Sequence, residues 1–274
     1  MLDVAQSSLS RQIRTLEVEL RQNLFYRNGR GADLTDAGKL FFEHARAMLE
    51  SATRARSALT ELDKDPGGRI VIGLPPRVAR TFTAQLVQSF RKRFPGATIC
   101  IVEGLSTALQ EWLVLGRIEL ALLFGPLPSP QLELEPLFRE EMVLVGHADA
   151  APGLPATVRF AQLANYSLML PQMPNATRVL LESICKRTGT SLRVVVEVDT
   201  VQAILELILL KQGFGILPKS AVAANARRGE LATAHIKNPG VWSNLVLASS
   251  RQRPMTKLAH QTRKLMHDLN FPMK

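Results

Sequence analysis

Residues 4–49 read VAQSSLSRQIRTLEVELRQNLFYRNGRGADLTDAGKLFFEHARAML, and their pattern decides the fold of the N-terminal quarter. Residues 5–20 predict an amphipathic helix, because apolar side chains recur at steps of four, three and four along one face. The turn-rich residues 23–34 are typical of a tight two-stranded wing or a loop. Thr35 followed by Asp36 predicts the start of a second helix. The apolar face of the first helix consists of Leu9, Ile13, Leu16 and Leu20.

The second helix is predicted over residues 35–62, which contain no proline. A small or apolar stripe recurs there at alternating steps of three and four, and the helix would be about 42 Å long at ~1.5 Å per residue. A helix of that length usually packs against a partner helix. Residues 63–68, DKDPGG, end it, so we expect a domain boundary near residue 66. The stripe consists of Ala37, Phe41, His44, Met48, Ser51, Ala55, Ala58 and Leu62.

After this boundary the pattern changes to short apolar strands that alternate with helices, which predicts an α/β fold with mainly parallel sheets covered on both faces. The strands are expected at 69–74, 98–103, 119–124, 142–146, 167–171, 192–198, 214–218 and 244–249. The helices are expected near 79–93, 107–115, 175–189, 200–211 and 254–269.

Eight strands favour two α/β lobes rather than one sheet, and the proline-rich run 125–141 resembles a connection. Within that run the pairs Glu133/Glu135 and Glu140/Glu141 are interpreted as solvated loop charges. The C-terminal helix is expected to pack on the first lobe. The predicted division is 1–34, 35–64 and 65–274, the last with a first lobe at about 69–141 and 250–274 and a second at about 142–249.

Polar side chains gather at the beginning of the first helix. Arginine pairs with guanine, glutamine pairs with adenine, and serine adapts to either, so this set is typical of major-groove reading. The alternative is an ordinary capped surface helix. The set consists of Gln6, Ser7, Ser8, Ser10 and Arg11.

Together these residues resemble the LysR-type transcriptional regulators. The pattern xAQSxLSRQIxxLExELxxxLFxRxxRGxxLTxAGxxF places a recognition helix, a wing and a linker helix in one register. The remainder of the chain is similar to that family's effector domain, a two-lobed fold of the periplasmic-binding-protein type II kind. Residues 103–126, EGLSTALQEWLVLGRIELALLFGP, resemble the subgroup that includes nitrogen-assimilation-type regulators.

The resemblance implies a sequence-specific regulator that binds double-stranded promoter DNA as a homo-oligomer, a tetramer built as a dimer of dimers. The five polar residues of the first helix would read bases, while Arg14, Arg27 and Arg30 would contact phosphates or the minor groove. A small anionic effector, carboxylate or amino-acid-like, would bind between the lobes. The residues implied for it are Pro76, Arg77, Ser106, Thr107, Phe124, Gly125, Thr200 and Val201.

Two features of this effector set leave alternatives open. Each serine or threonine is also explained as a helix N-cap. Pro76 stands where many members of the family have a hydroxyl, so one donor is missing, and Arg77 would compensate through a bidentate contact with a carboxylate. The alternative interpretation is that this chain is a regulator that responds to no effector.

The resemblance also implies a first helix and half of the helix-turn-helix, about 20–30 residues, before Met1. Without them the apolar face of the first helix loses much of the surface that it would bury, at about 1.5–3 kcal/mol per large side chain. We therefore expect either a misassigned start or a truncated form. The alternatives are a truncated paralogue that dimerises and binds ligand but binds DNA weakly, or a small-molecule-binding protein.

Composition and the absence of certain motifs limit the functional classes to which the protein can belong. The net charge is +10, yet residues 1–64 hold ten basic and nine acidic side chains, so total charge is a weak argument for DNA. Cys100 and Cys185 lack metal-ligand spacing and are expected to be free thiols. We find no export signal, membrane segment, phosphate loop, nucleophile motif or histidine pair with metal spacing. We expect a cytoplasmic protein that is no enzyme, with no catalytic residue, metal, cofactor or membrane partner.

Overall fold

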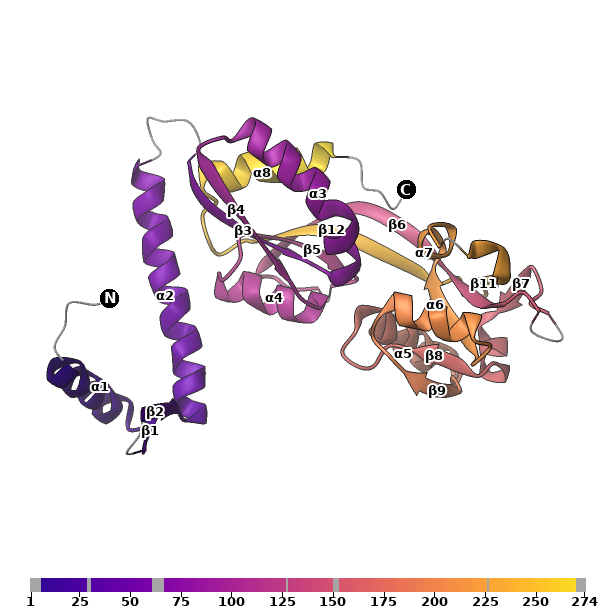
Figure 1. Ribbon diagram of the computed structural model, residues 1–274, viewed down its shortest axis with the longest axis horizontal. Helices are drawn as coiled ribbons and strands as arrows, with labels where there is room; N and C mark the ends of the chain where they lie inside the picture. Colours follow the sequence, from indigo (N-terminus) through magenta and orange to yellow (C-terminus); the bar gives the residue numbers. More distant parts are fainter. Residues whose placement is uncertain are drawn as a thin grey trace. The chain divides into compact units, whose positions relative to one another are not determined.

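The computed structural model describes residues 6–28, 31–60, 67–126, 128–149, 153–225 and 227–269 (Figure 1). Arg30 and most of the predicted hinge at 63–68 lie outside the described residues. The chain divides into two compact units, Met1–Leu59 and Thr60–Lys274. The first unit thus contains both the expected DNA-binding segment and nearly all of the long helix.

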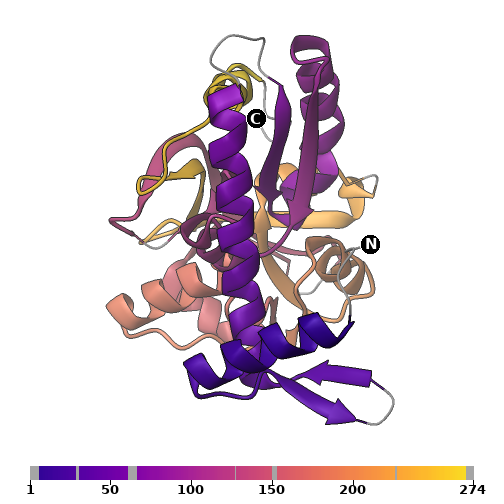
Figure 2. The same ribbon diagram turned by 90° about the vertical axis from the view of Figure 1, so that its left-hand side faces the viewer.

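The first unit has the elements that its sequence predicts. They are α1 (Gln6–Leu20), the antiparallel pair β1 (Phe25–Asn28) and β2 (Gly31–Leu34), and α2 (Asp36–Thr60). Figure 2 shows α1 and the β1–β2 hairpin at one end of α2, which runs without a break for 25 residues. The wing is therefore a hairpin, and α2 is about 38 Å long.

The turn between α1 and the hairpin depends on one carboxylate. Glu17 Oε1 accepts hydrogen bonds from the backbone N–H groups of Leu24 at 2.8 Å and Phe25 at 3.2 Å. Leu24 is buried, whereas α1 has no fully buried side chain. Leu9 is 41% exposed, and the apolar face of α1 is only partly covered by the described residues. The orientation of α1 is therefore set more by hydrogen bonds than by packing.

The start of α2 is also tied to this turn. Thr35 Oγ1 donates to the Asn23 carbonyl at 2.6 Å and accepts from the Gly38 N–H at 2.9 Å, so Thr35 is a side-chain N-cap. Gly38 is buried directly against Leu24. A Cβ atom at Gly38 would lie 2.0 Å from the Leu24 carbonyl oxygen, a distance that backbone atoms do not tolerate. Glycine is thus needed here for close approach, although its φ is helical.

The first lobe of the second unit is a mixed sheet in the order β4-β3-β5-β12-β6. Its βαβ part is parallel, as predicted, because β3 pairs in parallel with both β4 and β5. The antiparallel strands β12 and β6 complete it. The elements are β3 (Gly68–Leu74), α3 (Pro76–Arg93), β4 (Ala97–Glu103), α4 (Ser106–Leu115), β5 (Leu120–Phe124), β6 (Leu132–His147), β12 (Trp242–Ser250) and α8 (Lys257–Asp268).

The second lobe continues the sheet through the far half of β6 in the order β6-β10-β8-β9, with β11 and β7 on the other side of β6. The strands β10, β8 and β9 are parallel to one another. The elements are β7 (Thr157–Arg159), the 3₁₀ helix η1 (Phe160–Asn165), β8 (Leu168–Leu170), α5 (Ala176–Thr188), β9 (Val194–Glu197), α6 (Val201–Leu209), β10 (Phe214–Pro218), α7 (Lys219–Ala223), the 3₁₀ helix η2 (Arg228–Glu230) and β11 (Leu231–Lys237).

Two strands, β6 and β12, run from one lobe to the other, and they correct two predictions. Residues 132–141 are strand rather than connection; Pro136 is accommodated because β6 bulges beside it, between its pairings with Val246 and Leu245. The sequence pattern assigns residues 244–249 to the second lobe, but Leu245 to Ser249 pair with β5 in the first. The pattern identifies an apolar strand without identifying the sheet that it joins.

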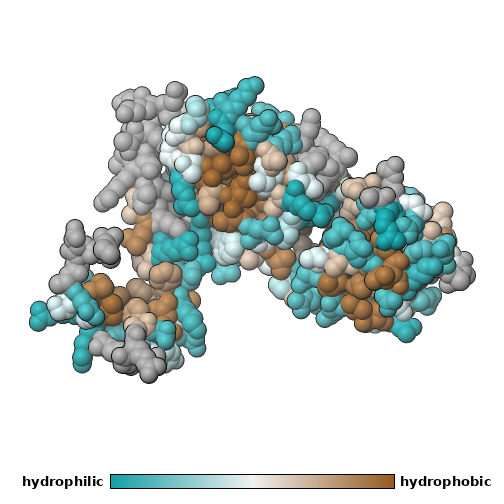
Figure 3. Space-filling view, viewed as in Figure 1, coloured by the Kyte–Doolittle hydropathy of each residue, from teal (hydrophilic) through white to brown (hydrophobic). Residues whose placement is uncertain are grey.

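Each lobe has a core on both faces of its sheet, as an α/β fold requires. In the first lobe, α3 buries a side chain every four residues from Val78 to Phe90 against one face, where α8 also packs through Leu258 and Met266. The expected position of the C-terminal helix is confirmed. α4 covers the opposite face through Leu109 and Leu113. Figure 3 shows brown hydrophobic surface near α3 and α8, bordered by hydrophilic residues.

We expect Gly38→Ala to loosen the first unit. An exposed helical Gly→Ala change normally stabilises by about 1 kcal/mol, but here the new Cβ meets the Leu24 carbonyl and costs about 1–3 kcal/mol by overpacking. Hydrogen exchange followed by mass spectrometry should show faster exchange in residues 17–45. Gly96→Ala is the matched control, because no atom lies within 4 Å of a Cβ there. Equal protection in the two variants would contradict the close-packing role of Gly38.

Candidate functional site

A cleft of about 880 Å³ opens between the two lobes of the second unit. Both lobes contribute βα loops to it: the first through the loops after β3 and β4, the second through those after β8 and β9. These loops leave the carboxyl ends of parallel strands, where α/β sheets commonly bind ligands. The lining is Pro75, Pro76, Arg77, Ala79, Arg80, Thr83, Ile101, Glu103, Leu105, Ser106, Phe124, Met142, Asn175, Ala176, Thr177, Asp199, Thr200, Val201, Gln202, Pro218 and Ser243.

The cleft brings together six of the eight residues selected for effector binding. Thr107 and Gly125 do not line it. Thr107 follows Ser106 on α4, so the helical rotation turns its side chain away from the cleft and leaves it exposed. The six that line the cleft are Pro76, Arg77, Ser106, Phe124, Thr200 and Val201.

Four helices, α3, α4, α5 and α6, begin at the wall of the cleft. Their first N–H groups have no partner within the helix and carry the positive end of the helix dipole, so they favour a negatively charged group. Thr200 Oγ1 accepts from the Ala203 N–H at 3.2 Å, which makes it an N-cap. Ser106 is buried and is not a cap, because its Oγ accepts from the Phe124 N–H at 2.9 Å. Its hydroxyl proton therefore remains available to donate.

Arg77 is held by groups from three elements. Its Nη1 donates to Glu140 Oε2 on β6 at 2.9 Å and to Ser220 Oγ on α7 at 3.2 Å. Its guanidinium carbon lies 4.7 Å from the centre of the Phe124 ring. The backbone N–H of Ser220 also donates to Glu140 Oε1 at 3.0 Å. Arg77 thus bridges both lobes and one crossing strand.

The interpretation of Glu140 and Glu141 as solvated loop charges is wrong. Both lie in β6, and Glu140 is 5% exposed in its ion pair with Arg77. Glu141 Oε1 lies 2.7 Å from His235 Nδ1 on β11. The side chains alternate across the strand, so adjacent carboxylates serve opposite faces.

Glu133 and Glu135, on the other half of β6, are also paired. Arg263 of α8 contacts Glu133 Oε2 at 2.9 Å and Glu135 Oε1 at 2.5 Å. The interpretation of Glu133 and Glu135 as loop charges is therefore also wrong. The prolines of residues 125–141 indicated a connection, although residues 132–141 form a strand.

Two carboxylates in the cleft, Glu103 and Asp199, were missed by the sequence analysis. Glu103 ends β4, and Asp199 lies in the loop between β9 and α6, next to the N-cap Thr200. Asp199 accepts from the backbone N–H of Gln172 at 3.3 Å and from its Nε2 at 3.0 Å. Glu103 is the last residue of one predicted strand and Asp199 directly follows another, and this position at strand ends was the signal that would have identified them.

The helix α1 begins at Gln6, and the residues selected for base contacts are exposed along its first turns. Arg14 is exposed one turn later, and Arg27 lies in β1. The exposed polar set is Gln6, Ser7, Ser8, Ser10 and Arg11.

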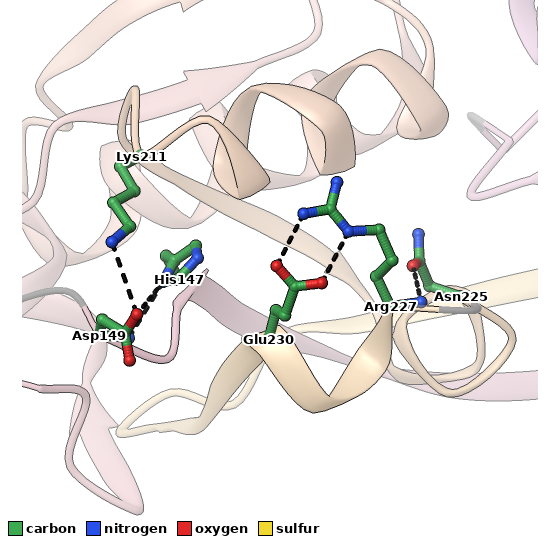
Figure 4. A network of polar contacts seen from close by, with 6 residues as sticks. All are labelled: His147, Asp149, Lys211, Asn225, Arg227 and Glu230. Carbon is green, nitrogen blue, oxygen red and sulfur yellow. Dashed lines mark hydrogen bonds and ion pairs between the residues drawn. The ribbon is translucent and has the colours of Figure 1, made fainter.

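Figure 4 shows a second polar cluster in the second lobe, none of whose labelled residues lines the cleft. His147 is buried at the end of β6, and its Nδ1 accepts from the Asp149 N–H at 3.0 Å. Arg227 holds Glu230 through two hydrogen bonds of 2.7 Å, which lower the pKa of that carboxyl. Within the described ranges we find no group of three residues that would hold a metal. No described helix is both long and apolar enough to cross a membrane.

Comparison with known families identifies both parts of the chain. Residues 63–270 match the LysR substrate binding domain, and residues 1–39 match the bacterial regulatory helix-turn-helix proteins of the lysR family. The chain belongs to the LysR family. This LysR-family chain is therefore a DNA-binding transcriptional regulator with an effector-binding domain.

Curated relatives agree with the expected subgroup. The nitrogen assimilation regulatory protein nac of Escherichia coli K12 is 31% identical over 81% of this chain and 72% of its own length. That of Klebsiella aerogenes is 28% identical over 98% of this chain and 88% of its own length. Among solved structures, full-length CbnR complexed with its target DNA is similar, with a TM-score of 0.67 and 23% identity over 96% of this chain and 90% of that one. The predicted family, subgroup and fold class are confirmed.

We expect Arg77→Met to destabilise the second unit by about 3–5 kcal/mol, because Glu140 would be left as a buried charge without its counter-ion. Adding Glu140→Leu should recover most of that loss. Urea denaturation followed by tryptophan fluorescence reports on this unit, since Trp112 and Trp242 both lie in it.

Arg80→Met is the matched control for this experiment. Arg80 lies one turn along α3, is exposed and forms no ion pair with the residues that the structure describes. If the two single variants unfold at the same urea concentration, the Arg77–Glu140 pair has no special structural role.

Proposed function

We propose that this regulator reads promoter DNA through the first turns of α1 and that its activity is controlled by a small effector bound in the interlobe cleft. It would act in the cytoplasm and bind its effector without chemical change. The observation that carries this proposal is the exposed polar face of α1, on which side chains suited to base edges stand together. Arg14, Arg27 and Arg30 would contact the DNA backbone.

The proposed effector is small and carries a carboxylate, as amino-acid-like molecules do. The four helix N-termini and the Ser106 hydroxyl offer donors to such a group. Arg77 is less suited to that contact than the sequence predicted, because its Nη1 already donates to Glu140, whose carboxylate offsets the positive charge of the guanidinium. Binding across the lobes would favour one lobe arrangement and thereby change the spacing of the DNA-binding units in the oligomer.

The proposed assembly is a tetramer built as a dimer of dimers. Within the first unit α2 leaves large apolar side chains exposed: Phe42 and Leu49, seven residues apart and therefore on one face of the helix, are 52% and 71% exposed. Helices with such faces pair with a second helix to bury them. A second copy of α2 is the partner that we propose.

A second candidate function is a regulator subunit that dimerises and binds ligand but binds DNA weakly. The observation that favours it is the absence of a fully buried side chain in α1. A recognition helix that is poorly supported pays an ordering cost when it binds. Binding of the unmodified chain to DNA at low salt separates the two candidates.

We expect Arg11→Ala to weaken specific binding by about 1–3 kcal/mol and to reduce discrimination among sequences. Fluorescence anisotropy should compare the DNA upstream of the chain's own gene with a shuffled duplex at one fixed salt concentration. Arg91→Ala, which changes an exposed arginine of the second unit that does not line the cleft, is the control. Equal losses on the two duplexes would contradict base reading, and no binding by the unmodified chain at low salt would favour the second candidate.

Arg14→Ala should behave differently. A lost phosphate contact weakens binding to both duplexes alike and reduces the slope of log K against log salt by about 1. The same anisotropy titrations, repeated between about 50 and 200 mM salt, measure that slope. An unchanged slope with a change in sequence preference would instead assign Arg14 to the bases.

A further inference from the structure

The charges around the cleft do not match a ligand that is only an anion. Two arginines and two carboxylates line it: Arg77, Arg80, Glu103 and Asp199. Buried Glu140, paired with Arg77 behind the lining, adds a third carboxylate. The cleft and its immediate support therefore carry one more negative than positive charge, although the whole chain carries a formal +10.

Glu140 is firmly held in this arrangement. One of its oxygens accepts from Arg77 at 2.9 Å and the other from the Ser220 N–H at 3.0 Å. Drawing Arg77 away would leave a carboxylate that is 5% exposed without its counter-ion, which is strongly unfavourable. A ligand carboxylate that approaches Arg77 therefore meets a cation that is already neutralised.

The two unburied carboxylates occupy corresponding positions in the two lobes. Glu103 precedes α4 in the first lobe, and Asp199 precedes α6 in the second. The Glu103 carboxylate forms no hydrogen bond or ion pair with the residues that the structure describes. Asp199 is fixed by Gln172, and its oxygens keep lone pairs that can accept from a cation on the cleft side. A cationic group bound in the cleft thus has a carboxylate available on either wall.

The rest of the lining is mostly apolar. Ile101 and Leu105 come from the first lobe and Val201 and Pro218 from the second, while Met142 lies on the crossing strand β6. Apolar walls with a few polar groups favour a small hydrophobic body held in a defined orientation. Because such walls lower the local dielectric constant, they strengthen the discrimination between ligand charges.

We infer that Glu140 sets the charge selectivity of the cleft, so that the effector is a zwitterion with a protonated amine and an apolar body rather than a plain carboxylate. The amine would contact Asp199 or Glu103, and the carboxylate would contact the helix N-termini rather than Arg77. This inference rests on the proposed function, in which the cleft is the effector site.

Two sets of matched probes test the inference on the full chain by isothermal titration calorimetry. The first set is L-leucine, 3-methylbutylamine and 4-methylpentanoate; the second is L-phenylalanine, 2-phenylethylamine and 3-phenylpropanoate. In each set the body is the same, and the second and third probes lack the carboxylate or the amine. We expect the amino acid to bind most tightly in at least one set and its deaminated partner to bind at least about tenfold more weakly.

The Glu140→Gln variant gives the sharpest comparison. Releasing Arg77 should raise affinity for the deaminated carboxylates by about tenfold and leave the two amines nearly unchanged. Glu141→Gln is the matched control, since its carboxylate contacts His235 and does not line the cleft. If Glu140→Gln fails to fold, Asp199→Asn should weaken binding of the amine-bearing probes by about tenfold.

Three results would overturn the inference. The first is that the deaminated carboxylates bind the unmodified chain with the same affinity as the amino acids. The others are that no amine-bearing probe binds at about 10 mM, or that folded Glu140→Gln has the same selectivity as the unmodified chain. A separate measurement of DNA binding, made without any of these probes, distinguishes failure of the charge-selectivity inference from failure of the proposed function. Intact specific DNA binding with no amine preference overturns the inference alone. Amine preference without DNA binding overturns DNA regulation alone.

Discussion

The buried ion pair between Arg77 and Glu140 is the contact on which the second unit most depends. It joins the first turn of α3 in one lobe to the strand β6, and Ser220 at the start of α7 in the other lobe completes it. A charge pair of this kind is costly to bury and costly to break, because removal of one partner leaves the other as an uncompensated buried charge. The same pair decides which charge the neighbouring cleft accepts.

The crossing strands explain why this contact lies where it does. β12 pairs with residues 132–141 of β6, and both strands belong to both lobes, so side chains on β6 reach the cleft side and its opposite face in alternation. Glu140 faces Arg77, whereas Glu141 faces His235. The strand β6 therefore contributes both the carboxylate that holds Arg77 at the cleft and the carboxylate that contacts β11 in the second lobe.

Within its described residues, the first unit is stabilised by hydrogen bonds and one close backbone approach rather than by a buried ion pair. Its hairpin and helix ends are joined by backbone N–H groups that donate to Glu17 Oε1 and Thr35 Oγ1 and by the close approach that Gly38 permits. Little of α1 is buried, while α2 keeps large apolar side chains exposed. Such a unit relies on association for burial that its own few elements do not supply. This dependence agrees with the oligomer that we propose.

Periodicity and capping signals depend on neighbouring residues, so α1, the wing, α2 and the βα units lie where residues 4–49 and the later apolar runs predict them. The short elements β7, β11 and α7 were not predicted. The sequence by itself also determined the family and six residues of the cleft lining. Three features are visible only in the folded chain: residues 132–141 form a strand, β12 returns to the first lobe, and Arg77 is neutralised by a carboxylate 63 positions away. Strand partners and counter-ions are chosen by long-range packing, and no spacing rule encodes them.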